Sequence, residues 1–189
     1  MKHQLKFRTA HVSDIQKLVD LINLAYRHQQ GNSWTSEAEI VTGDRINTEQ
    51  LLQMMADDHF KLFVVEQAKE IVACIGLRFN SSEVEIGTFC IASKMQNQGI
   101  GKQVLDFAES YISDKVRLAY PDLKYFVMWV LSVRHELIDY YERRGYRQTG
   151  HIEGYPVNAN VGIPIVDLHL IEMKKCIPNG SHADQKRKP

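Results

Sequence analysis

Apolar residues recur along the chain with two spacings, and each spacing predicts one kind of secondary structure. A spacing of three or four residues is typical of helices, and it covers residues 15–28, 47–55, 100–111 and 135–143. Short runs rich in β-branched and aromatic residues are typical of strands, and they cover residues 5–9, 62–65, 71–77, 83–92, 125–131, 146–152 and 163–173. The resulting order, β-α-α-β-β-β-α-β-α-β-β, predicts a mixed α/β sheet with helices on its faces.

Turn and capping residues indicate where several of these elements begin and end. Asn47, followed three residues later by Gln50, matches a capping box. Residues 67–70 join two strands as a hairpin, and the unbroken apolar run 125–131 is typical of a central strand covered on both faces. Pro164 has no backbone N–H, so we expect it at the beginning of the last strand.

The length and composition indicate one ordinary globular domain. A chain of 189 residues suffices for a single full core, and 44% hydrophobic with 24% charged residues are typical values for such a domain. We expect the domain to occupy residues 1–175. Beyond it the sequence becomes polar, and we expect residues 176–189 to be a disordered tail.

Charge and cysteine content narrow the function classes. Lys and Arg total 23, as do Asp and Glu, so the balance gives no sign of a nucleic-acid or membrane surface. Cys74, Cys90 and Cys176 lack the Cys-x-x-Cys spacing of zinc sites, which favours a reducing compartment, and we expect no metal site. The N-terminus lacks an apolar signal core and no run approaches the ~20 residues of a membrane span, so we expect a cytoplasmic protein.

Residues 96–102 (QNQGIGK) form a glycine-bearing turn between a predicted strand and a predicted helix. The first turn of a helix leaves backbone N–H groups unpaired, and together with the helix dipole they attract phosphate. Gly99 and Gly101 let the backbone approach without a Cβ, and Lys102 adds a cation. The segment is not a P-loop, because Gln103 stands where Ser or Thr is needed. By itself the turn fits a pyrophosphate site and a plain tight connection equally well.

The turn resembles the Gln/Arg-x-x-Gly-x-Gly/Ala segment of the GNAT acetyltransferase superfamily, which binds the pyrophosphate of acetyl-CoA. Residues 134–146 (RHELIDYYERRGY) resemble that family's second signature, a helix with a Tyr-Glu pair before Gly-Phe or Gly-Tyr. The predicted element order is also the GNAT order, and the resemblance covers roughly residues 4–175. It implies a mixed, mostly antiparallel central sheet with helices on both faces, splayed between the fourth and fifth strands.

The resemblance implies acetyl-CoA as co-substrate, with no metal. The implied contacts are Phe89, Cys90, Ile91, Gln96, Asn97, Gln98, Gly99, Ile100, Gly101, Lys102 and Arg134. Asn97 and Gln98 stand where glycine and a basic residue are commoner, a change that binding through backbone N–H groups tolerates. Arg134 stands where many members carry asparagine; contact with a CoA phosphate and a plain flanking role at the helix start are both open.

Acetyl transfer to an amine needs a base for the amine, a donor for the oxyanion and a proton for the leaving thiolate. The family's proton donor falls on Tyr141, which equally fits the core face that Leu137 and Ile138 share on the same helix. Tyr140 is expected to point elsewhere, because adjacent helix residues do not share a face. The implied oxyanion contact is the strand backbone around Phe89.

Glu85 is the candidate general base. It lies eleven residues before Gln96, the position of the base glutamate in histone-type members, whereas other members use an ordered water. Glu83 shares its strand face, so we expect it at the substrate site, where the two carboxylates would raise each other's pKa. A solvated strand edge is the competing interpretation of Glu85. Cys90 lies inside a strand without a histidine beside it in sequence, so no covalent cysteine intermediate is expected.

The resemblance also locates the acceptor pocket and so completes a functional prediction. Its walls fall on residues 29–45 and 154–162, where Trp34 is suited either to contact the substrate or to plug the core edge.

The prediction is an acetyl-CoA-dependent N-acetyltransferase that modifies the amine of a small molecule or peptide by direct attack in a ternary complex. A non-catalytic acyl-CoA-binding or regulatory domain is the alternative. The neutral charge balance disfavours charged tRNA as acceptor. Nucleic acid and membrane are not expected partners, and a homodimer is left open.

Overall fold

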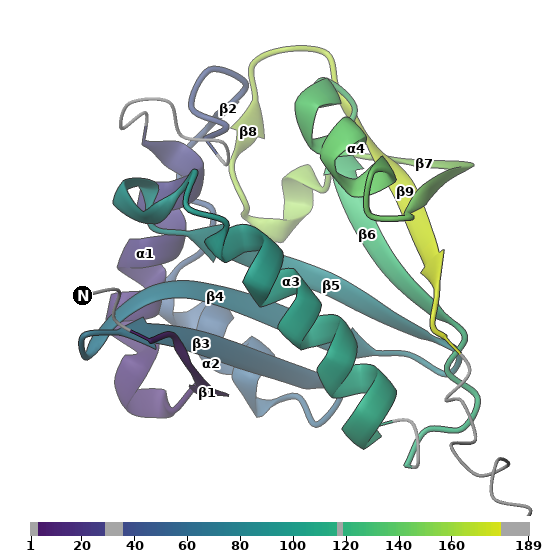
Figure 1. Cartoon of the computed structure of the whole chain (residues 1–189). Coiled ribbons are helices and arrows are strands. Elements are labelled where there is room, and N and C mark those ends of the chain that lie inside the picture. Colours follow the sequence, from purple (N-terminus) through teal and green to yellow (C-terminus); the bar gives the residue numbers. More distant parts are fainter. Residues whose placement is uncertain (1–3, 29–35, 117–118, 179–189) are drawn as a thin grey trace, which may run out of the picture.

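The computed structural model describes residues 4–28, 36–116 and 119–178, which build a seven-stranded sheet with helices on both faces (Figure 1). Across the sheet the strands are β1 (Lys6–Thr9), β3 (Phe60–Gln67), β4 (Glu70–Phe79), β5 (Glu83–Ile91), β6 (Tyr125–Leu131), β9 (His169–Cys176) and β7 (Arg147–Gly154). Every neighbouring pair is antiparallel except β5 with β6. This confirms the predicted mixed, mostly antiparallel sheet.

Two helices cover each face of the sheet. Successive strand residues point to opposite faces, so each face has apolar side chains that a helix can bury. The helices are α1 (Ile15–Arg27), α2 (Thr48–Ala56), α3 (Ile100–Tyr111) and α4 (His135–Glu142), with short helical turns at Val12–Asp14, Ser93–Met95, Ile112–Val116 and Val157–Ala159. On one face of β3, Val64 packs with Ile22 of α1. On the other face, Val65 packs in the cluster that contains Val104 of α3.

Two local sequence signals have the predicted geometry. The Asn47 side chain accepts a hydrogen bond from the Gln50 N–H at 2.9 Å, and the Gln50 side chain accepts one from the Asn47 N–H at 2.8 Å. The capping box at the start of α2 is therefore confirmed. Between β3 and β4, Ala68 and Lys69 both adopt positive φ (51° and 71°), which is the backbone of a two-residue hairpin turn.

Strands β5 and β6 pair over only three residues each, and this sets the architecture of the site. The paired residues are Glu83 with Tyr125, Val84 with Phe126 and Glu85 with Val127. Beyond them the two strands separate towards the top of Figure 1. The splay predicted between the fourth and fifth strands is confirmed.

A bulge in β5 lies at the place where the strands separate. Between the pairs Cys74–Cys90 and Gly76–Gly87, β5 carries one more residue than β4. In that interval Thr88 adopts φ +47°, a conformation that is strained for a β-branched residue. The bulge takes main-chain groups out of the ladder beside the splay.

The last strand is shorter than predicted. Strand β9 begins at His169, whereas Ile163 and Pro164 form β8, which pairs with β2 (Val41–Thr42) in a separate ladder. The prediction that Pro164 begins the last strand is therefore wrong: a residue without an N–H is accommodated opposite Val41 in a two-residue ladder. The predicted disordered tail falls mostly on residues 179–189, outside the described residues.

Candidate active site

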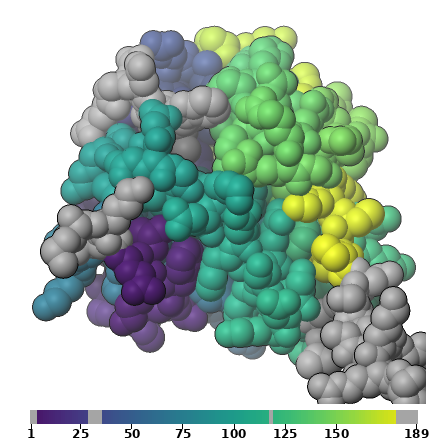
Figure 2. Space-filling view, viewed as in Figure 1, coloured from purple at the N-terminus to yellow at the C-terminus, as the bar shows by residue number. Residues whose placement is uncertain are grey.

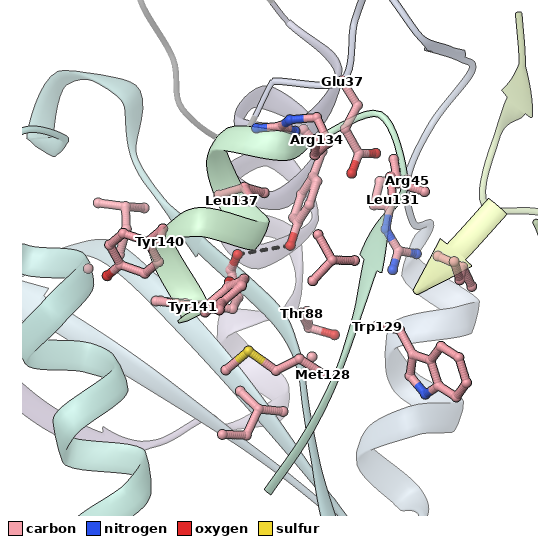
Figure 3. Close-up of a pocket in the computed structure, with 18 of the residues that line it drawn as sticks. Glu37, Arg45, Thr88, Met128, Trp129, Leu131, Arg134, Leu137, Tyr140 and Tyr141 are labelled. Carbon is pink, nitrogen blue, oxygen red and sulfur yellow. Dashed lines mark hydrogen bonds between the residues drawn. The ribbon is translucent and has the colours of Figure 1, made fainter. Parts of the chain in front are cut away.

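A cavity of about 590 Å³ opens where β5 and β6 separate. Figure 2 shows the teal surface around α3 beside the green surface of α4, and Figure 3 shows the interior between them. The residues that line it include Tyr26, Glu37, Arg45, Glu85, Thr88, Phe89, Ile91, Gln96, Asn97, Gly99, Gly101, Lys102, Trp129, Arg134, Tyr140, Tyr141, Arg144, Glu153, Tyr155 and Val161. The cavity therefore joins the predicted phosphate turn to both predicted acceptor loops.

The turn before α3 has a backbone suited to an anion. Gly99 precedes the helix in the left-handed conformation (φ +75°), and no side chain caps the first turn. Asn97 is also left-handed (φ +60°), and asparagine adopts this conformation more readily than most residues other than glycine. Left-handed residues interspersed in a turn direct N–H groups to one side, where they form an anion-binding concavity. The asparagine thus preserves a turn for which the family pattern has glycine.

The residues of this turn divide between the cavity and the core. Gln96 donates a hydrogen bond from Nε2 to the Ile91 carbonyl at 3.0 Å, which joins the turn to the end of β5. The Gln98 side chain donates instead to the Lys94 carbonyl, and Ile100 is buried in the core. Gln98 and Ile100, both expected at the cofactor site, do not line the cavity.

Strand β5 lines the cavity from Glu85 to Phe89 and again at Ile91. Phe89 and Ile91 line it, whereas Cys90 faces the α1 side of the sheet, with its Sγ 3.5 Å from that of Cys74. Cys90 was expected at the cofactor site, but its side chain does not line the cavity. The Phe89 carbonyl accepts a hydrogen bond from the Tyr26 hydroxyl at 2.8 Å. Tyr26 belongs to the predicted apolar stripe of α1, and that pattern gave no sign that its hydroxyl reaches the splay.

Tyr140 and Tyr141 of α4 both line the cavity (Figure 3). Burial raises the pKa of both hydroxyls, so each phenol keeps its proton. A Cβ added to Gly101 would lie 3.6 Å from the Tyr140 hydroxyl, which places that hydroxyl beside the phosphate turn. Arg144 stacks over the Tyr140 ring, 3.4 Å from its centroid. The prediction that Tyr140 points away from the site is therefore wrong, because both tyrosines line the cavity with their rings edge to face, 5.3 Å between centroids.

The structure separates the two carboxylates that the strand pattern placed together. Glu83 accepts a hydrogen bond from Lys174 at 2.6 Å and does not line the cavity, contrary to its expected place at the substrate site. Glu85 does line it. Burial raises the pKa of Glu85, Glu153 of β7 adds to the rise, and Arg78 and Arg45 oppose it. The negative charge near Glu85 therefore comes from Glu153 of β7. The Glu83 carboxylate is instead held by Lys174 of β9.

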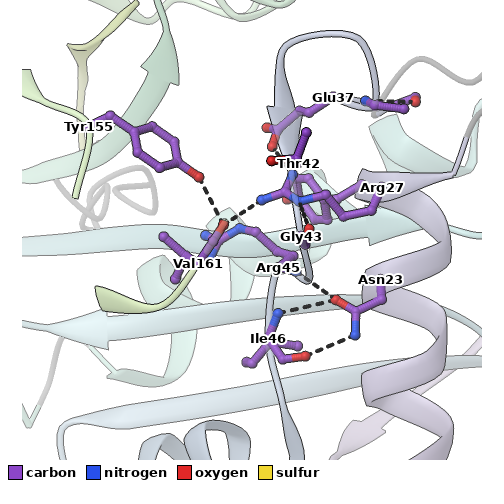
Figure 4. Close-up of polar contacts among 12 residues, drawn as sticks. Asn23, Arg27, Glu37, Thr42, Gly43, Arg45, Ile46, Tyr155 and Val161 are labelled. Carbon is purple, nitrogen blue, oxygen red and sulfur yellow. Dashed lines mark hydrogen bonds and ion pairs between the residues drawn. The ribbon is translucent and has the colours of Figure 1, made fainter. Parts of the chain in front are cut away.

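The two loops predicted to wall the acceptor pocket are tied together by Arg27 of α1 (Figure 4). Its guanidinium forms an ion pair with Glu37 and donates hydrogen bonds to the carbonyls of Gly43 (2.9 Å) and Val161 (2.6 Å). The Tyr155 hydroxyl donates to the same Val161 carbonyl at 2.9 Å. These contacts bring residues 36–45 and 154–162 to one end of the cavity. Trp34 lies outside the described residues.

Arg134 is buried at the start of α4, forms an ion pair with Glu136 and lines the cavity. Both of its predicted roles therefore stay open, since it stands at the helix start and at the cavity wall. At the rim, Lys102 pairs with Asp106 at 2.5 Å on exposed helix surface.

The sequence of residues 30–155 matches the family described as an acetyltransferase (GNAT) domain. The chain belongs to the GNAT acetyltransferase family. Its fold resembles that of the Escherichia coli N-acetyltransferase that modifies an alanine of a ribosomal protein (TM-score 0.66, 12% identity, 96% of this chain and 99% of that chain). It also resembles a Vibrio cholerae spermidine N-acetyltransferase in complex with CoA and spermine (TM-score 0.65, 17% identity, 92% and 96%). No curated protein matches this GNAT chain in sequence.

Several cavity-lining residues were not predicted from the sequence. Glu37, Arg45, Glu153 and Tyr155 line the acceptor end, and all four lie in or beside the loops that the family resemblance assigned to it. The charged residues in or beside those loops were the sequence feature that could have identified them as part of the cavity wall. In the described ranges, no helix combines the length and apolar character needed to cross a membrane.

Proposed function

We propose that this GNAT protein transfers the acetyl group of acetyl-CoA to an amine by direct attack within one ternary complex. The observation that carries the proposal is the cavity itself. It joins a turn with left-handed residues at a helix start to an acceptor end that holds a partly buried carboxylate, and it passes through the splay between β5 and β6.

The turn and its surroundings fit a diphosphate. The helix start supplies backbone N–H donors, and Lys102 and Arg144 add positive charge around it. Tyr140 presents its hydroxyl beside Gly101. In this proposal acetyl-CoA supplies the activated acetyl group, and the bulged backbone of β5 around Phe89 offers main-chain donors for the thioester oxygen.

Glu85 and Tyr141 have environments that suit opposite tasks. Burial favours the protonated form of both groups. A raised pKa makes Glu85 a better acceptor for the proton of an alkylammonium, directly or through a water, and it keeps a proton on Tyr141 for the leaving thiolate. The amine nitrogen then forms a bond to the carbonyl carbon, the carbon–sulfur bond breaks, and the thiolate takes the proton of Tyr141. The new amide nitrogen loses its remaining extra proton, which returns to the Tyr141 oxygen directly or through water, so that the net proton released stays on Glu85.

The test is CoA release with acetyl-CoA and a panel of small amines, peptides, ribosomal proteins and charged tRNA. The proposal predicts release that requires an amine in the panel and yields the acetylated amine. Tyr141→Phe should bind acetyl-CoA normally and release CoA slowly. Tight binding of acetyl-CoA without transfer to any acceptor would instead support the non-catalytic alternative.

A further inference from the structure

The acceptor end of the cavity contains an arginine that forms no ion pair with any described residue. Arg45 lies between β2 and α2, where its backbone N–H donates to Asn23 Oδ1 at 2.8 Å. The next N–H, of Ile46, donates to the same oxygen at 3.1 Å. This double anchor fixes the backbone, and the half-buried side chain extends into the cavity (Figures 3 and 4).

The other arginines around the site are held more closely than Arg45. Arg27 pairs with Glu37, Arg134 pairs with Glu136, and Arg144 stacks on Tyr140 at 3.4 Å and donates to its carbonyl. Within the described residues, the Arg45 guanidinium forms neither an ion pair nor a hydrogen bond, and it lies over the Tyr26 ring at the longer distance of 5.6 Å from Cζ to the centroid. A partly desolvated cation in a ligand cavity is stabilised by a ligand that carries the opposite charge.

Two carboxylates at the same end also lack an ionic partner among the described residues. Glu85 comes from β5 and Glu153 from β7, and both line the cavity. The acceptor end therefore presents one available cation and two available anions. A polyamine complements only the anions, whereas a molecule with both an ammonium and a carboxylate complements both signs.

Tyr26 relates these charges to the proposed reaction point. Its hydroxyl bonds the Phe89 carbonyl at the splay, and its ring lies next to Arg45. The guanidinium therefore contacts the same side chain whose hydroxyl reaches the proposed reaction point. This proximity suits an amine and a carboxylate that belong to one small molecule.

We propose that Arg45 binds a carboxylate of the acceptor, so that the acceptor class is amino acids and related amino carboxylates rather than polyamines. The inference rests on the proposed N-acetyltransferase function. Arg45 acts in substrate selection: its planar guanidinium holds the carboxylate in a bidentate contact and thereby directs the amine towards the splay.

The experiment compares kcat/KM for amino acids and for the same molecules without the carboxylate, using α- and γ-amino acids with their decarboxylated amines, and spermidine. Wild type, Arg45→Gln and Arg45→Lys are measured. A hydrogen-bonded charged contact contributes about 10- to 100-fold to affinity. Arg45→Gln should lose this factor for carboxylate-bearing acceptors, mainly through KM, and change the plain amines no more than the control variant Arg78→Gln does. Arg45→Lys should recover part of it.

Arg78→Gln is the matched control. Arg78 does not line the cavity, and its ion pair with Asp57 is half exposed, so its loss costs little stability. Burial raises the pKa of Glu85, and both Arg78 and Arg45 oppose that rise. Losing either arginine should therefore raise the pKa of Glu85 further. Arg78→Gln should therefore change both acceptor classes equally.

The outcomes separate the two proposals. Acetylation of plain amines or spermidine as efficiently as of amino acids would overturn the role of Arg45 and leave the acetyltransferase function intact. An equal loss for both classes in Arg45→Gln would do the same. If no amine of any class is acetylated, the proposed function itself fails, and the inference fails with it.

Discussion

Gly101 gives a prediction in which stability and ligand binding move in opposite directions. It lies in the first turn of α3 and lines the cavity. A Cβ at this position would lie 3.6 Å from the Tyr140 hydroxyl and 4.0 Å from Ile91 Cγ1, which are ordinary contact distances. The fold therefore accepts Gly101→Ala, and replacing a helical glycine by alanine stabilises by about 0.5–1 kcal/mol. For a chain of this size the melting temperature of the free protein should rise by roughly 1–4 °C.

The same methyl group occupies the proposed pyrophosphate site. With acetyl-CoA at a hundred times its Kd, the wild-type protein gains about 2.7 kcal/mol by mass action, which corresponds to roughly 5–11 °C. If the methyl weakens binding a hundredfold, the same ligand concentration contributes only about 0.4 kcal/mol. The ligand-induced shift should then fall to roughly 1–2 °C. Thermal melting with and without acetyl-CoA measures both effects in one experiment.

Gly99→Ala is the contrasting variant. Its Cβ would meet nothing within 4 Å, but the residue has φ +75°. The left-handed conformation costs an alanine roughly 1–2 kcal/mol, so this variant should lower the melting temperature of the free protein. A Gly101→Ala protein that keeps the full acetyl-CoA shift would show that the phosphate site is misplaced. A lowered melting temperature in the free Gly101→Ala protein would refute the packing argument.

Four further predictions concern catalysis, cofactor binding and the loop that contains Gly162. Tyr141→Phe should reduce turnover by roughly 10- to 1000-fold, about 1.4 kcal/mol of barrier per factor of ten, with acetyl-CoA affinity and melting temperature unchanged. Tyr140→Phe should instead weaken acetyl-CoA binding, because its hydroxyl lies beside the turn. Glu85→Gln should lower turnover by ~10²–10⁴-fold at neutral pH and less at alkaline pH, where the amine is already deprotonated. Gly162→Ala should cost roughly 1–3 kcal/mol or more, because φ is +101° and its Cβ would lie 2.6 Å from the Thr42 carbonyl.

Specific results would contradict these predictions, and an unchanged acetyl-CoA affinity in Tyr140→Phe is the first of them. Normal turnover with a lowered melting temperature in Tyr141→Phe would make Tyr141 a core residue. An unchanged pH–rate profile in Glu85→Gln would leave an ordered water as the base. If Gly162→Ala unfolds at the same denaturant concentration as the wild type, the β2–β8 ladder must shift to make room for the added methyl group.

The stability of Glu85→Gln provides a check that is independent of activity. Because burial raises the pKa of Glu85, the folded state binds its proton more tightly than the unfolded state. The stability that this side chain contributes is complete below its unfolded pKa of ~4.3 and is lost as the pH rises through the folded value. Glutamine should therefore raise the melting temperature at neutral pH, and the gain should disappear near pH ~4. A constant difference across this range would contradict the burial of Glu85.

Much of the fold was predictable because its signals are local. The capping box at Asn47, the hairpin turn and the helix start at Gly99 each depend on a few adjacent residues, and the structure has all three. Pro164 was misplaced because its partner, Val41, lies far away in the sequence. Hydrophobic spacing carries no information about which distant segment completes a short ladder.

The site was less predictable, because the splay decides which residues meet. Strand alternation correctly places Glu83 and Glu85 on one face, but only the position of Lys174 shows that Glu83 is engaged elsewhere. Helical spacing separates Tyr140 from Tyr141, yet the cavity is wide enough to include both. The sequence could not single out Arg45 within its loop. Its proposed role in binding depends on the absence of an ion-pair partner among the described residues, and only the fold shows that.

The central claim is direct transfer from acetyl-CoA to an amine while both are bound. Initial rates of CoA release, measured with acetyl-CoA and an accepted amine varied together, test it most directly. Double-reciprocal plots should intersect, because both substrates must be bound before acetyl transfer. Parallel lines, or CoA release in a burst before any amine is added, would indicate a covalent acetyl-enzyme and contradict the account.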